Sequence, residues 1–406
     1  MSGIDHTHSP DGWPASLNGS PGVDAAFTVP FIHRVRFTRD ALDPANETLA
    51  EAVAHPRPAV PHKCLFVVDE GVARAWPDLS RRIGEYAAMH SDRIRQAGPV
   101  LLVAGGEAAK NDQRVFDAVT RAIHEHGICR RSYVIALGGG AMLDAIGFAA
   151  ATSHRGVRLI RLPTTTLAQD DAGVGVKNGI NAFNKKNFLG SFNPPWAVIN
   201  DETFLSTLSD RDWRSGLSEA VKVALVKDAG FFADILESAP KLRQRDQATA
   251  LPIIRRCAEL HLQHIVAGGD PFELTRARPL DFGHWSAHKL EPMSNYELRH
   301  GEAVAIGLAI DVIYSNLLGW MNDHDTQQVL SCLNAIGFVL HHPAARDSKT
   351  LLDGLEEFRQ HLGGELTITL LKGIGRPVDV HEIDRDRMTQ AIQRLATLSG
   401  PGAEAV

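Results

Sequence analysis

The chain is poor in the residues that build disulfide frameworks and zinc ribbons. Its 406 residues include only four cysteines, and none of them forms a C-x-x-C pair; they are Cys64, Cys129, Cys257 and Cys332. Cysteines scattered in this way exclude a disulfide scaffold, so we interpret them as free thiols in a reducing compartment. Long apolar runs are also missing, because no stretch reaches the ~18 residues that a membrane-spanning helix needs.

An excess of positive charge and a secretory signal are absent as well. The formal net charge is -6, with 44% hydrophobic and 22% charged residues, which is typical of a globular protein and not of a nucleic-acid binder. The opening residues, MSGIDHTHSPDGWP, have neither the basic start nor the apolar core of a signal peptide. We therefore expect a cytoplasmic protein that binds neither nucleic acid nor membrane and holds anionic ligands with local cations.

The apolar pattern divides the chain into three parts. Residues 1–25 are rich in Ser, Pro, Gly and His, which predicts a flexible tail. From 26 to 201, short apolar runs alternate with helical stretches, which predicts a parallel sheet covered by helices, with strands within 64–71, 99–107, 132–140, 157–165 and 196–201. From 202 to 406 the periodicity is helical, apart from a possible strand pair near 365–375. The predicted fold is α/β, a nucleotide-binding sheet domain followed by a mostly helical metal-binding domain, with the site in the cleft between them.

A glycine turn marks the expected cofactor site. Gly138, Gly139 and Gly140 follow an apolar strand and open a helix, where the backbone can approach a pyrophosphate at the helix N-terminus. The motif differs from G-x-G-x-x-G, and such turns are often purely structural. Further candidates stand at neighbouring strand ends and in the first turns of that helix; they are Asp69, Glu107, Lys110, Asp144, Thr164 and Thr165. Each of these could equally be a cap or turn residue.

Three histidines and one glutamate could supply a metal site. His284 and His288 stand at i and i+4, on one face of an expected helix, and His300 comes twelve residues after the second of them. Glu219 lies upstream, at the expected start of another helix. Catalytic zinc commonly takes three such ligands and keeps one position open. Spacing does not decide which histidines bind, because the chain contains 19 of them.

The stretch 163–192 is the most unusual in the chain, since it is too polar for a core element. Its lysines and asparagines are donors of the kind that phosphate needs; they are Lys177, Asn181, Lys185, Lys186 and Asn187. Asp171 adds a carboxylate, Arg155 lies just upstream, and Lys222 follows Glu219 by one helical turn. The alternative interpretation is a solvated basic loop.

Together these segments resemble 3-dehydroquinate synthase and its relatives, the sugar phosphate cyclases. Family elements are matched in order between about 60 and 376: G-E-x-x-K at 106–110, G-G-G-x-x-x-D-x-x-G-F-x-A at 138–150, P-T-T-x-L-A-Q-x-D at 163–171, G-x-K-x-G-x-N at 175–181, K-N at 186–187, G-x-x-E-x-x-K at 216–222, F-G-H-x-x-x-H at 282–288 and H-G-E-A-V-A-I-G at 300–307. Each element alone is weak, but the set is highly specific.

The resemblance implies a phosphate-eliminating lyase that uses NAD and Zn²⁺, with Co²⁺ as a possible substitute. In this family the ring hydroxyl is oxidised transiently, phosphate leaves, the hydride returns, and an intramolecular aldol step closes a carbocycle. Glu219, His284 and His300 would hold the metal, and Lys186 would join the cofactor-binding residues. The residues that contact the substrate would be Asp171, Lys177, Lys222, Asn187, Asp281 and His288, the last near the phosphate. Arg155 would reach over from a partner subunit, which implies a homodimer.

Three departures from the family pattern bear on the substrate. His261 stands where dehydroquinate synthases have a lysine that helps to bind the substrate carboxylate, Asp281 replaces an asparagine, and Ala277 replaces an arginine. Arg276 or Arg278 could substitute for that arginine. Losing a bidentate arginine and placing a carboxylate nearby costs several kcal/mol for an anionic head group. A neutral-headed substrate is therefore favoured, such as sedoheptulose 7-phosphate, as in the branch that makes 2-epi-valiolone.

The retained His288 complicates this assignment, because the best-known 2-epi-5-epi-valiolone synthases have proline at that position. The alternatives are an ordinary 3-dehydroquinate synthase, a metal-dependent polyol dehydrogenase with the same two-domain plan, and a ligand-binding protein without catalysis. The dehydrogenase has no need of the lysine–asparagine stretch. A binding protein has no need of an open metal position.

Overall fold

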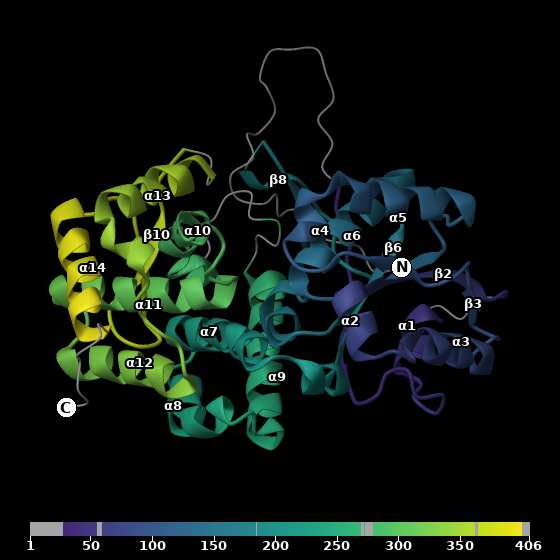
Figure 1. Cartoon of the computed structure of the whole chain (residues 1–406), viewed down its shortest axis with the longest axis horizontal. Helices are drawn as coiled ribbons and strands as arrows, with labels where there is room; N and C mark the ends of the chain where they lie inside the picture. Colours follow the sequence, from purple (N-terminus) through teal and green to yellow (C-terminus); the bar gives the residue numbers. More distant parts are fainter. Residues whose placement is uncertain are drawn as a thin grey trace, which may run out of the picture.

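A parallel seven-stranded sheet fills the first half of the computed structural model, which describes residues 27–54, 59–183, 185–268, 272, 279–361 and 364–399 (Figure 1). The expected tail and the arginines at 276 and 278 lie outside these residues. The strand order is β1-β9-β6-β5-β2-β3, and β4 also pairs with β2. The strands are β1 (Val35–Thr38), β2 (His62–Asp69), β3 (Ile94–Gln96), β4 (Leu101–Val103), β5 (Tyr133–Gly138), β6 (Arg158–Pro163) and β9 (Ala197–Asp201).

Helices cover both faces of this sheet because its central strands are apolar on both sides. Alternate residues of β2 enter different cores: Phe66 packs with Ile83 and Tyr86, whereas Val67 packs with Val119 and others on the opposite face. The helices of this half are α1 (Thr48–Val53), α2 (Glu70–Ala75), α3 (Leu79–Met89), α4 (Ala108–Asn111), α5 (Gln113–Glu125) and α6 (Gly140–Thr152). The predicted α/β class is confirmed, and all five predicted strands are present; β1 and β3 were not predicted.

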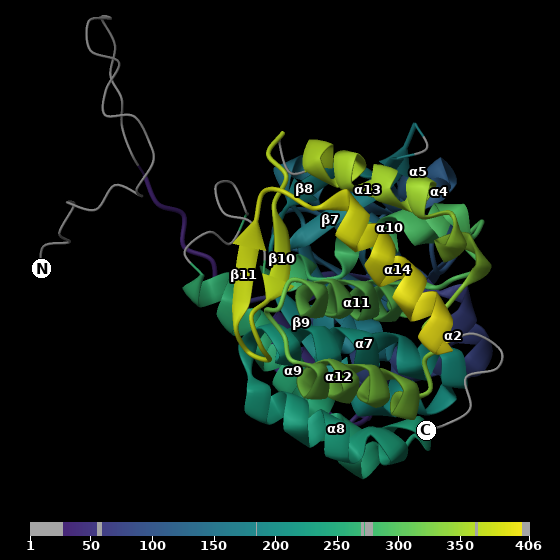
Figure 2. The ribbon, with the colours of Figure 1, turned by 90° about the vertical axis from the view of Figure 1, so that its left-hand side faces the viewer.

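The second half is a bundle of helices around a buried central one (Figure 2). This central helix, α11, buries most of its length among its neighbours. The helices are α7 (Asp210–Lys227), α8 (Ala229–Arg243), α9 (Gln247–Ala267), α10 (His284–Met293), α11 (His300–Leu317), α12 (Asp323–Ile336), α13 (Ser348–His361) and α14 (Arg385–Ser399). An antiparallel pair, β10 (Ile368–Leu371) with β11 (Pro377–Val380), stands near the predicted position. Among the described helices, none combines the length and apolarity that crossing a membrane requires.

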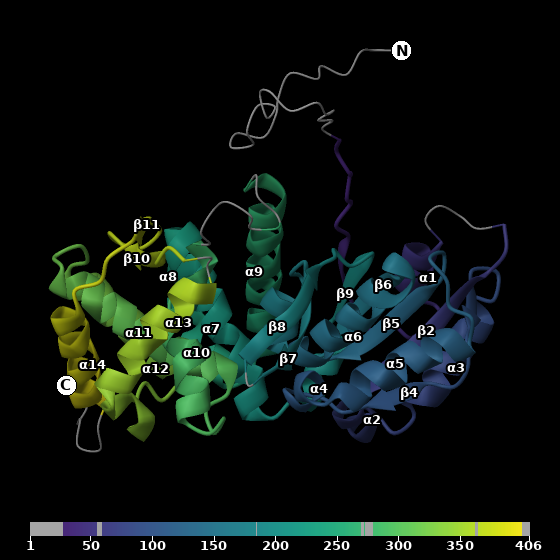
Figure 3. The ribbon, with the colours of Figure 1, turned by 90° about the horizontal axis from the view of Figure 1, so that it is seen from above.

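The polar stretch 163–192 has more regular structure than its composition indicates. It forms a π-helical turn at Ala168–Ala172 and then an antiparallel hairpin, β7 (Lys177–Ala182) and β8 (Lys185–Phe192). The hairpin lies between the sheet and the helical bundle (Figure 3). Period-two alternation is absent from β8, whose residues are mostly exposed, so no strand signal was visible in the sequence.

A buried arginine on β6 holds this stretch in place. Arg161 is fully buried, and its guanidinium donates to the backbone carbonyls of Ala172, Gly173, Gly175 and Lys177 at 2.9–3.3 Å. It also donates to the side-chain oxygen of Asn178 at 2.7 Å. One side chain thereby satisfies carbonyls throughout the segment that carries Asp171 and Lys177. If water satisfied these carbonyls instead, the segment would be mobile.

We expect Arg161→Met to destabilise the protein by roughly 3 kcal/mol or more, because it leaves several buried carbonyls without a donor. Arg158→Met, on the same strand, is the matched control. Arg158 is half-buried and contributes a hydrogen bond to Tyr133 and a stacking contact with Trp196, so about 1 kcal/mol is expected. Urea unfolding followed by circular dichroism measures both; equal losses would show that the carbonyl contacts of Arg161 contribute little.

Candidate active site and metal centre

Three side chains from three helices of the bundle converge on one point. Glu219 lies in the middle of α7, His284 is the first residue of α10, and His300 is the first residue of α11. Their ligand atoms all lie within 4.8 Å of one another. The prediction that Glu219 starts its helix was wrong, because α7 begins nine residues earlier, capped by Ser209.

Close helix packing is what brings the three together, and two glycines of α11 allow it. A Cβ on Gly301 would lie 2.0 Å from the carbonyl oxygen of Ser215 in α7, and one on Gly307 would lie 2.0 Å from that of Gly283 before α10. Asp311, further along α11, accepts hydrogen bonds from Gly283 N and Trp285 Nε1 at 3.0 and 2.8 Å. The start of α10, and with it His284, is therefore pinned to α11.

The donor set fits a divalent cation. Both carboxylate oxygens of Glu219 are buried without a hydrogen-bond partner, although the carboxylate forms an ion pair with Lys222. The Nε2 atoms of His284 and His300 lie 3.8 and 3.5 Å from Glu219 Oε1. An orphaned, buried carboxylate facing two imidazole nitrogens is an arrangement that a metal ion satisfies, and one carboxylate with two histidines is a common catalytic zinc set.

Electrostatics at this point favour positive charge. Burial raises the pKa of Glu219, but the ammonium of Lys222 together with the imidazoles of His300 and His284 outweighs burial and lowers the pKa to about 2. Burial lowers the pKa of His300, yet Glu219 and Glu291 outweigh it and raise the pKa to about 9. Burial also lowers the pKa of Lys222, but Asp171 and Glu219 reverse that effect and raise it above its ordinary value. The carboxylates thus hold charge that cations must balance.

Asp171 and His261 form a second pair beside this centre. His261 Nδ1, on α9, lies 2.9 Å from Asp171 Oδ1 in the π-helical turn. Burial raises the pKa of Asp171, but Lys222 and His261 outweigh burial and hold the pKa well below its usual range. The neighbouring Asp170 is fully buried with neither oxygen hydrogen-bonded, and burial, followed by repulsion from Asp171 and Glu219, raises its pKa well above normal. The pKa values of these adjacent carboxyl groups are thus shifted in opposite directions.

The carboxyl ends of β2, β4 and β5 form a cradle at the predicted cofactor site. Asp69 caps α2 by accepting from Gly71 N, and a Cβ on Gly105 would lie 2.0 Å from its carboxylate. A Cβ on Gly138 would lie 2.7 Å from Met142 Sδ and 3.2 Å from Asp69 Cβ. Glycine is therefore required here by the close approach of protein side chains, at the N-terminus of α6 where the sequence predicts a pyrophosphate. Gly139, Gly140, Thr164 and Thr165 surround the same turn.

Four more predicted cofactor or substrate residues are joined by side-chain contacts. Lys110 is buried and donates to Asp144 Oδ2 at 2.6 Å and to Asn187 Oδ1 at 2.8 Å. Glu107 accepts from Asn181 Nδ2 at 2.7 Å. These contacts connect α4 and α6 with the hairpin.

The remaining candidates are more dispersed. The rings of His288 and His284 are 5.4 Å apart at their centroids, but His288 has an exposed side chain and lies outside the three-residue cluster. Lys177 begins β7 and stands over the ring of Phe192, while the charge of Asp281 contributes to the raised pKa of Lys222. Arg155 lies on an exposed turn after α6, where its φ is 63°.

Sequence reasoning missed three site residues: Arg161, Asp170 and Glu291. Glu291 had a usable signal, because it stands seven residues after His284 and three after His288, on the same face of α10. Asp170 had none that distinguishes it from its neighbour Asp171. Arg161 had no signal either. Fully buried arginines are rare, so an arginine on a strand does not indicate a side chain that binds a series of backbone carbonyls.

Two family models together match most of the chain. The 3-dehydroquinate synthase N-terminal model matches residues 100–215, and the 3-dehydroquinate synthase C-terminal model matches residues 216–360. The chain belongs to the 3-dehydroquinate synthase family. The resemblance to the sugar phosphate cyclase superfamily is thereby confirmed, and the protein is an enzyme of that superfamily.

Relatives in this family carry two different activities. A 2-epi-5-epi-valiolone synthase from Streptomyces glaucescens is 33% identical over 87% of this chain and 87% of its own. A 3-dehydroquinate synthase from Xylella fastidiosa (strain M12) is 34% identical over 76% of this chain and 85% of its own. The structure of a 2-epi-5-epi-valiolone synthase from Streptomyces hygroscopicus subsp. jinggangensis 5008, with NAD⁺ and Zn²⁺ bound, superposes with a TM-score of 0.83 at 28% identity, covering 92% of this chain and 99% of that one.

The metal centre can be tested with two histidines of α10. We expect His284→Ala to lower zinc affinity by more than the ~10–100-fold that the loss of an outer-shell partner costs, because it removes a direct ligand. His288→Ala, one turn further along the same helix, should retain zinc. Atomic spectrometry after zinc loading and desalting measures both variants. Equal loss from the two would contradict the ligand set Glu219, His284 and His300.

Proposed function

We propose that this family member is an NAD- and zinc-dependent cyclase that converts sedoheptulose 7-phosphate to a carbocyclic cyclitol with loss of phosphate. The contact between His261 and Asp171 carries this choice of substrate. It occupies the place where a dehydroquinate synthase has a lysine for the substrate carboxylate, and among the described residues it puts there an imidazole that is paired with a carboxylate. The relative with bound NAD⁺ and Zn²⁺, together with the donor set at Glu219, supports the two cofactors.

The imidazole of His261 is committed to a carboxylate of the protein. With its Nδ1 2.9 Å from Asp171, only Nε2 remains for a ligand, and a single ring nitrogen gives one hydrogen bond to a hydroxyl or carbonyl. A substrate carboxylate is best held by a bidentate or doubly charged contact. The His261 side of the site therefore suits the uncharged hydroxymethyl ketone end of a sugar.

Asp281 adds a second reason to disfavour a carboxylated substrate. Its charge lies close enough to Lys222 and His284 to contribute to the raised pKa of the former and to oppose the lowered pKa of the latter. An anionic head group at this position would meet carboxylate repulsion, whereas substrate hydroxyls could donate to Asp281. The same acid therefore acts as a specificity element, accepting polyols and repelling acids.

Within this proposal the chain's own residues bind and orient the substrate and neutralise the charge that develops on it. When bound, NAD takes up and returns a hydride, and the metal ion polarises the substrate oxygens held near Glu219, His284 and His300. Lys222 remains an ammonium in the dry interior and donates to oxygens on which negative charge develops. Asp171, kept ionised, accepts from a substrate hydroxyl. The phosphate is held by cationic and amide donors, namely Lys177, Asn187 and His288.

We also propose that the enzyme acts as a homodimer in which Arg155 completes the phosphate site of its partner. Arg155 lies on an exposed turn, held in a left-handed conformation that turns the chain sharply after α6. Light scattering after size exclusion should give twice the mass of 44.2 kDa. A monomer with full activity would contradict this part of the proposal.

A 3-dehydroquinate synthase is the second candidate, and the retained His288 favours it. The family match favours either cyclase over the polyol dehydrogenase and the binding protein considered from the sequence. The two cyclases differ in the head group of the substrate and not in the chemistry. A direct comparison of substrates therefore separates them.

We expect phosphate release from sedoheptulose 7-phosphate in the presence of NAD and Zn²⁺, without net NADH formation, because the hydride returns within the same catalytic cycle. The carboxylated heptulosonate phosphate should react at least ~10-fold more slowly in kcat/KM, the cost of about 1.4 kcal/mol in the transition state. Faster release from the carboxylated substrate would establish the second candidate. NADH accumulation on simple polyols would refute both.

The double variant His261→Lys with Asp281→Asn restores the residues typical of dehydroquinate synthases. It adds a cation and removes an anion beside the head group, so we expect the preference for the neutral substrate to fall by roughly 10–100-fold. Lys227→Met, an exchange at an exposed lysine that contacts His264, controls for general changes of charge. An unchanged preference in the double variant would show that other residues recognise the head group.

A further inference from the structure

A buried glutamate outside the predicted site faces the back of one metal ligand. Glu291 lies on α10 and is 4% exposed. Its Oε2 is 3.6 Å from His300 Nδ1 and has no hydrogen-bond partner, while its Oε1 accepts from Lys186 Nζ at 2.8 Å. The glutamate is thus held at one oxygen and aimed with the other at an imidazole nitrogen.

The two histidine ligands present themselves in the same way. Each has its Nε2 toward Glu219 Oε1, at 3.8 Å for His284 and 3.5 Å for His300. Each has its Nδ1 toward an oxygen: the carbonyl of Phe282, at 3.1 Å, for His284, and Glu291 for His300. Histidines that ligate metals usually donate their other N–H to such an acceptor, which selects the tautomer and fixes the ring.

We propose that Glu291 is a positioning residue for His300, and that Lys186 holds it in place from the other half of the protein. The inference rests on the proposed metal site. When Nε2 of His300 takes an ion, Nδ1 must carry the proton, and Glu291 Oε2 is the acceptor for it. Lys186 neutralises the remaining charge of Glu291, so the carboxylate can stay buried beside the ligand.

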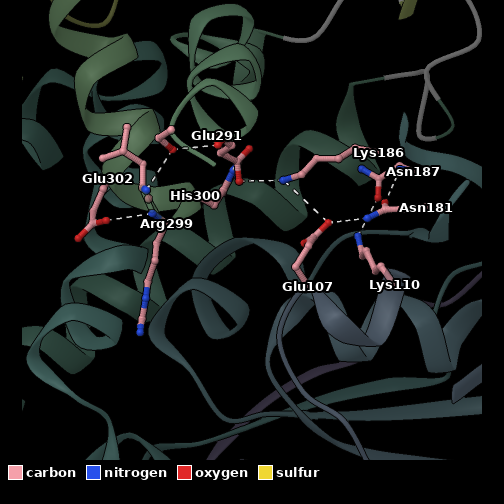
Figure 4. A network of polar contacts seen from close by, with 12 residues as sticks. Glu107, Lys110, Asn181, Lys186, Asn187, Glu291, Arg299, His300 and Glu302 are labelled. Carbon is pink, nitrogen blue, oxygen red and sulfur yellow. Dashed lines mark hydrogen bonds and ion pairs between the residues drawn. The ribbon is translucent and has the colours of Figure 1, made fainter. Parts of the chain in front are cut away.

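Lys186 connects Glu291 with the sheet half of the protein. It belongs to β8 in the hairpin, and besides Glu291 it lies 4.0 Å from Glu107 Oε1 at the end of the sheet half. Figure 4 shows the contacts running from His300 through Glu291 and Lys186 to Glu107 and on to the asparagines of the hairpin. A side chain predicted for the cofactor site therefore contacts the support of a metal ligand. Metal affinity should depend on Lys186, although it does not contact the metal position.

The first test measures metal affinity without turnover. Glu291→Gln should weaken Zn²⁺ binding by ~10–100-fold in competition with a chromophoric chelator, because the amide loses the charge and one acceptor oxygen. The visible absorption of the Co²⁺-loaded protein should also change. Glu302→Gln is the matched control: Glu302 lies in the first turn of α11 beside His300, but it bonds to Arg211 and to Arg299 N. It should bind Zn²⁺ as the wild type does.

The second test separates Lys186 from its neighbour. Lys186→Met should weaken Zn²⁺ binding several-fold and shift the Co²⁺ absorption in the same direction as Glu291→Gln. Lys185→Met should change neither, because Lys185 is exposed and stands over Phe188. Wild-type affinity in Lys186→Met would overturn the role of Lys186.

The outcomes also separate this inference from the metal site itself. Failure of the wild-type protein to bind Zn²⁺ or Co²⁺ would refute the site and with it the inference. Tight wild-type binding with an unaffected Glu291→Gln would leave the site and overturn the inference. If Glu291→Gln fails to fold by circular dichroism, Glu291→Asp takes its place: it keeps the charge but draws the carboxylate back by one methylene, so weakened binding supports the inference and unchanged binding overturns it.

Discussion

The burial of the Glu219 carboxylate is the constraint on which the rest of the site depends. An ion removed from water without hydrogen bonds costs several kcal/mol unless opposite charge surrounds it. Here Lys222, one turn along α7, and two imidazoles from α10 and α11 supply the surroundings, with room for a cation among them. Because no single helix can provide all of these groups, the bundle must pack tightly. This close contact requires the small residues of α11.

A second constraint is that the two halves must keep a fixed position relative to each other across the site. The segment after β6 achieves this by crossing between them. Its π-helical turn contacts α9 through Asp171 and His261, the residues that follow this turn are fastened by Arg161, and its hairpin contacts α10 through Lys186. Under the proposed function, hydride transfer needs a substrate on the helical half at a fixed distance from a nucleotide on the sheet. A connection made of charged hydrogen bonds is directional, and it therefore maintains that distance better than an apolar interface.

The sequence predicted the features that have a period or a motif. The five predicted strands followed from apolar runs, and the helices from their periodicity. The edge strands β1 and β3 are too short to show a pattern, whereas β4, which is as short as β3, was indicated by the apolar run at 99–103. The histidines at 284 and 300 were chosen through the family resemblance; spacing could not choose them, because their approach depends on how α10 and α11 cross. Arg161 acts through long-range contacts with the loop after β6 and leaves no trace in the local sequence. The contact of Glu291 with β8 is also long-range, and only its helical spacing from His284 and His288 could have indicated it.

The distribution of roles among the helices has a consequence for how such enzymes diversify. The helices α7, α10 and α11 supply the three residues of the metal cluster, whereas His261, which replaces a lysine of the relatives, is on α9. If His261 selects the substrate as proposed, a lineage can exchange the residue at this position without disturbing the metal cluster. If substrate choice and catalysis depend on different helices, relatives with similar sequence identity to this chain can have different activities.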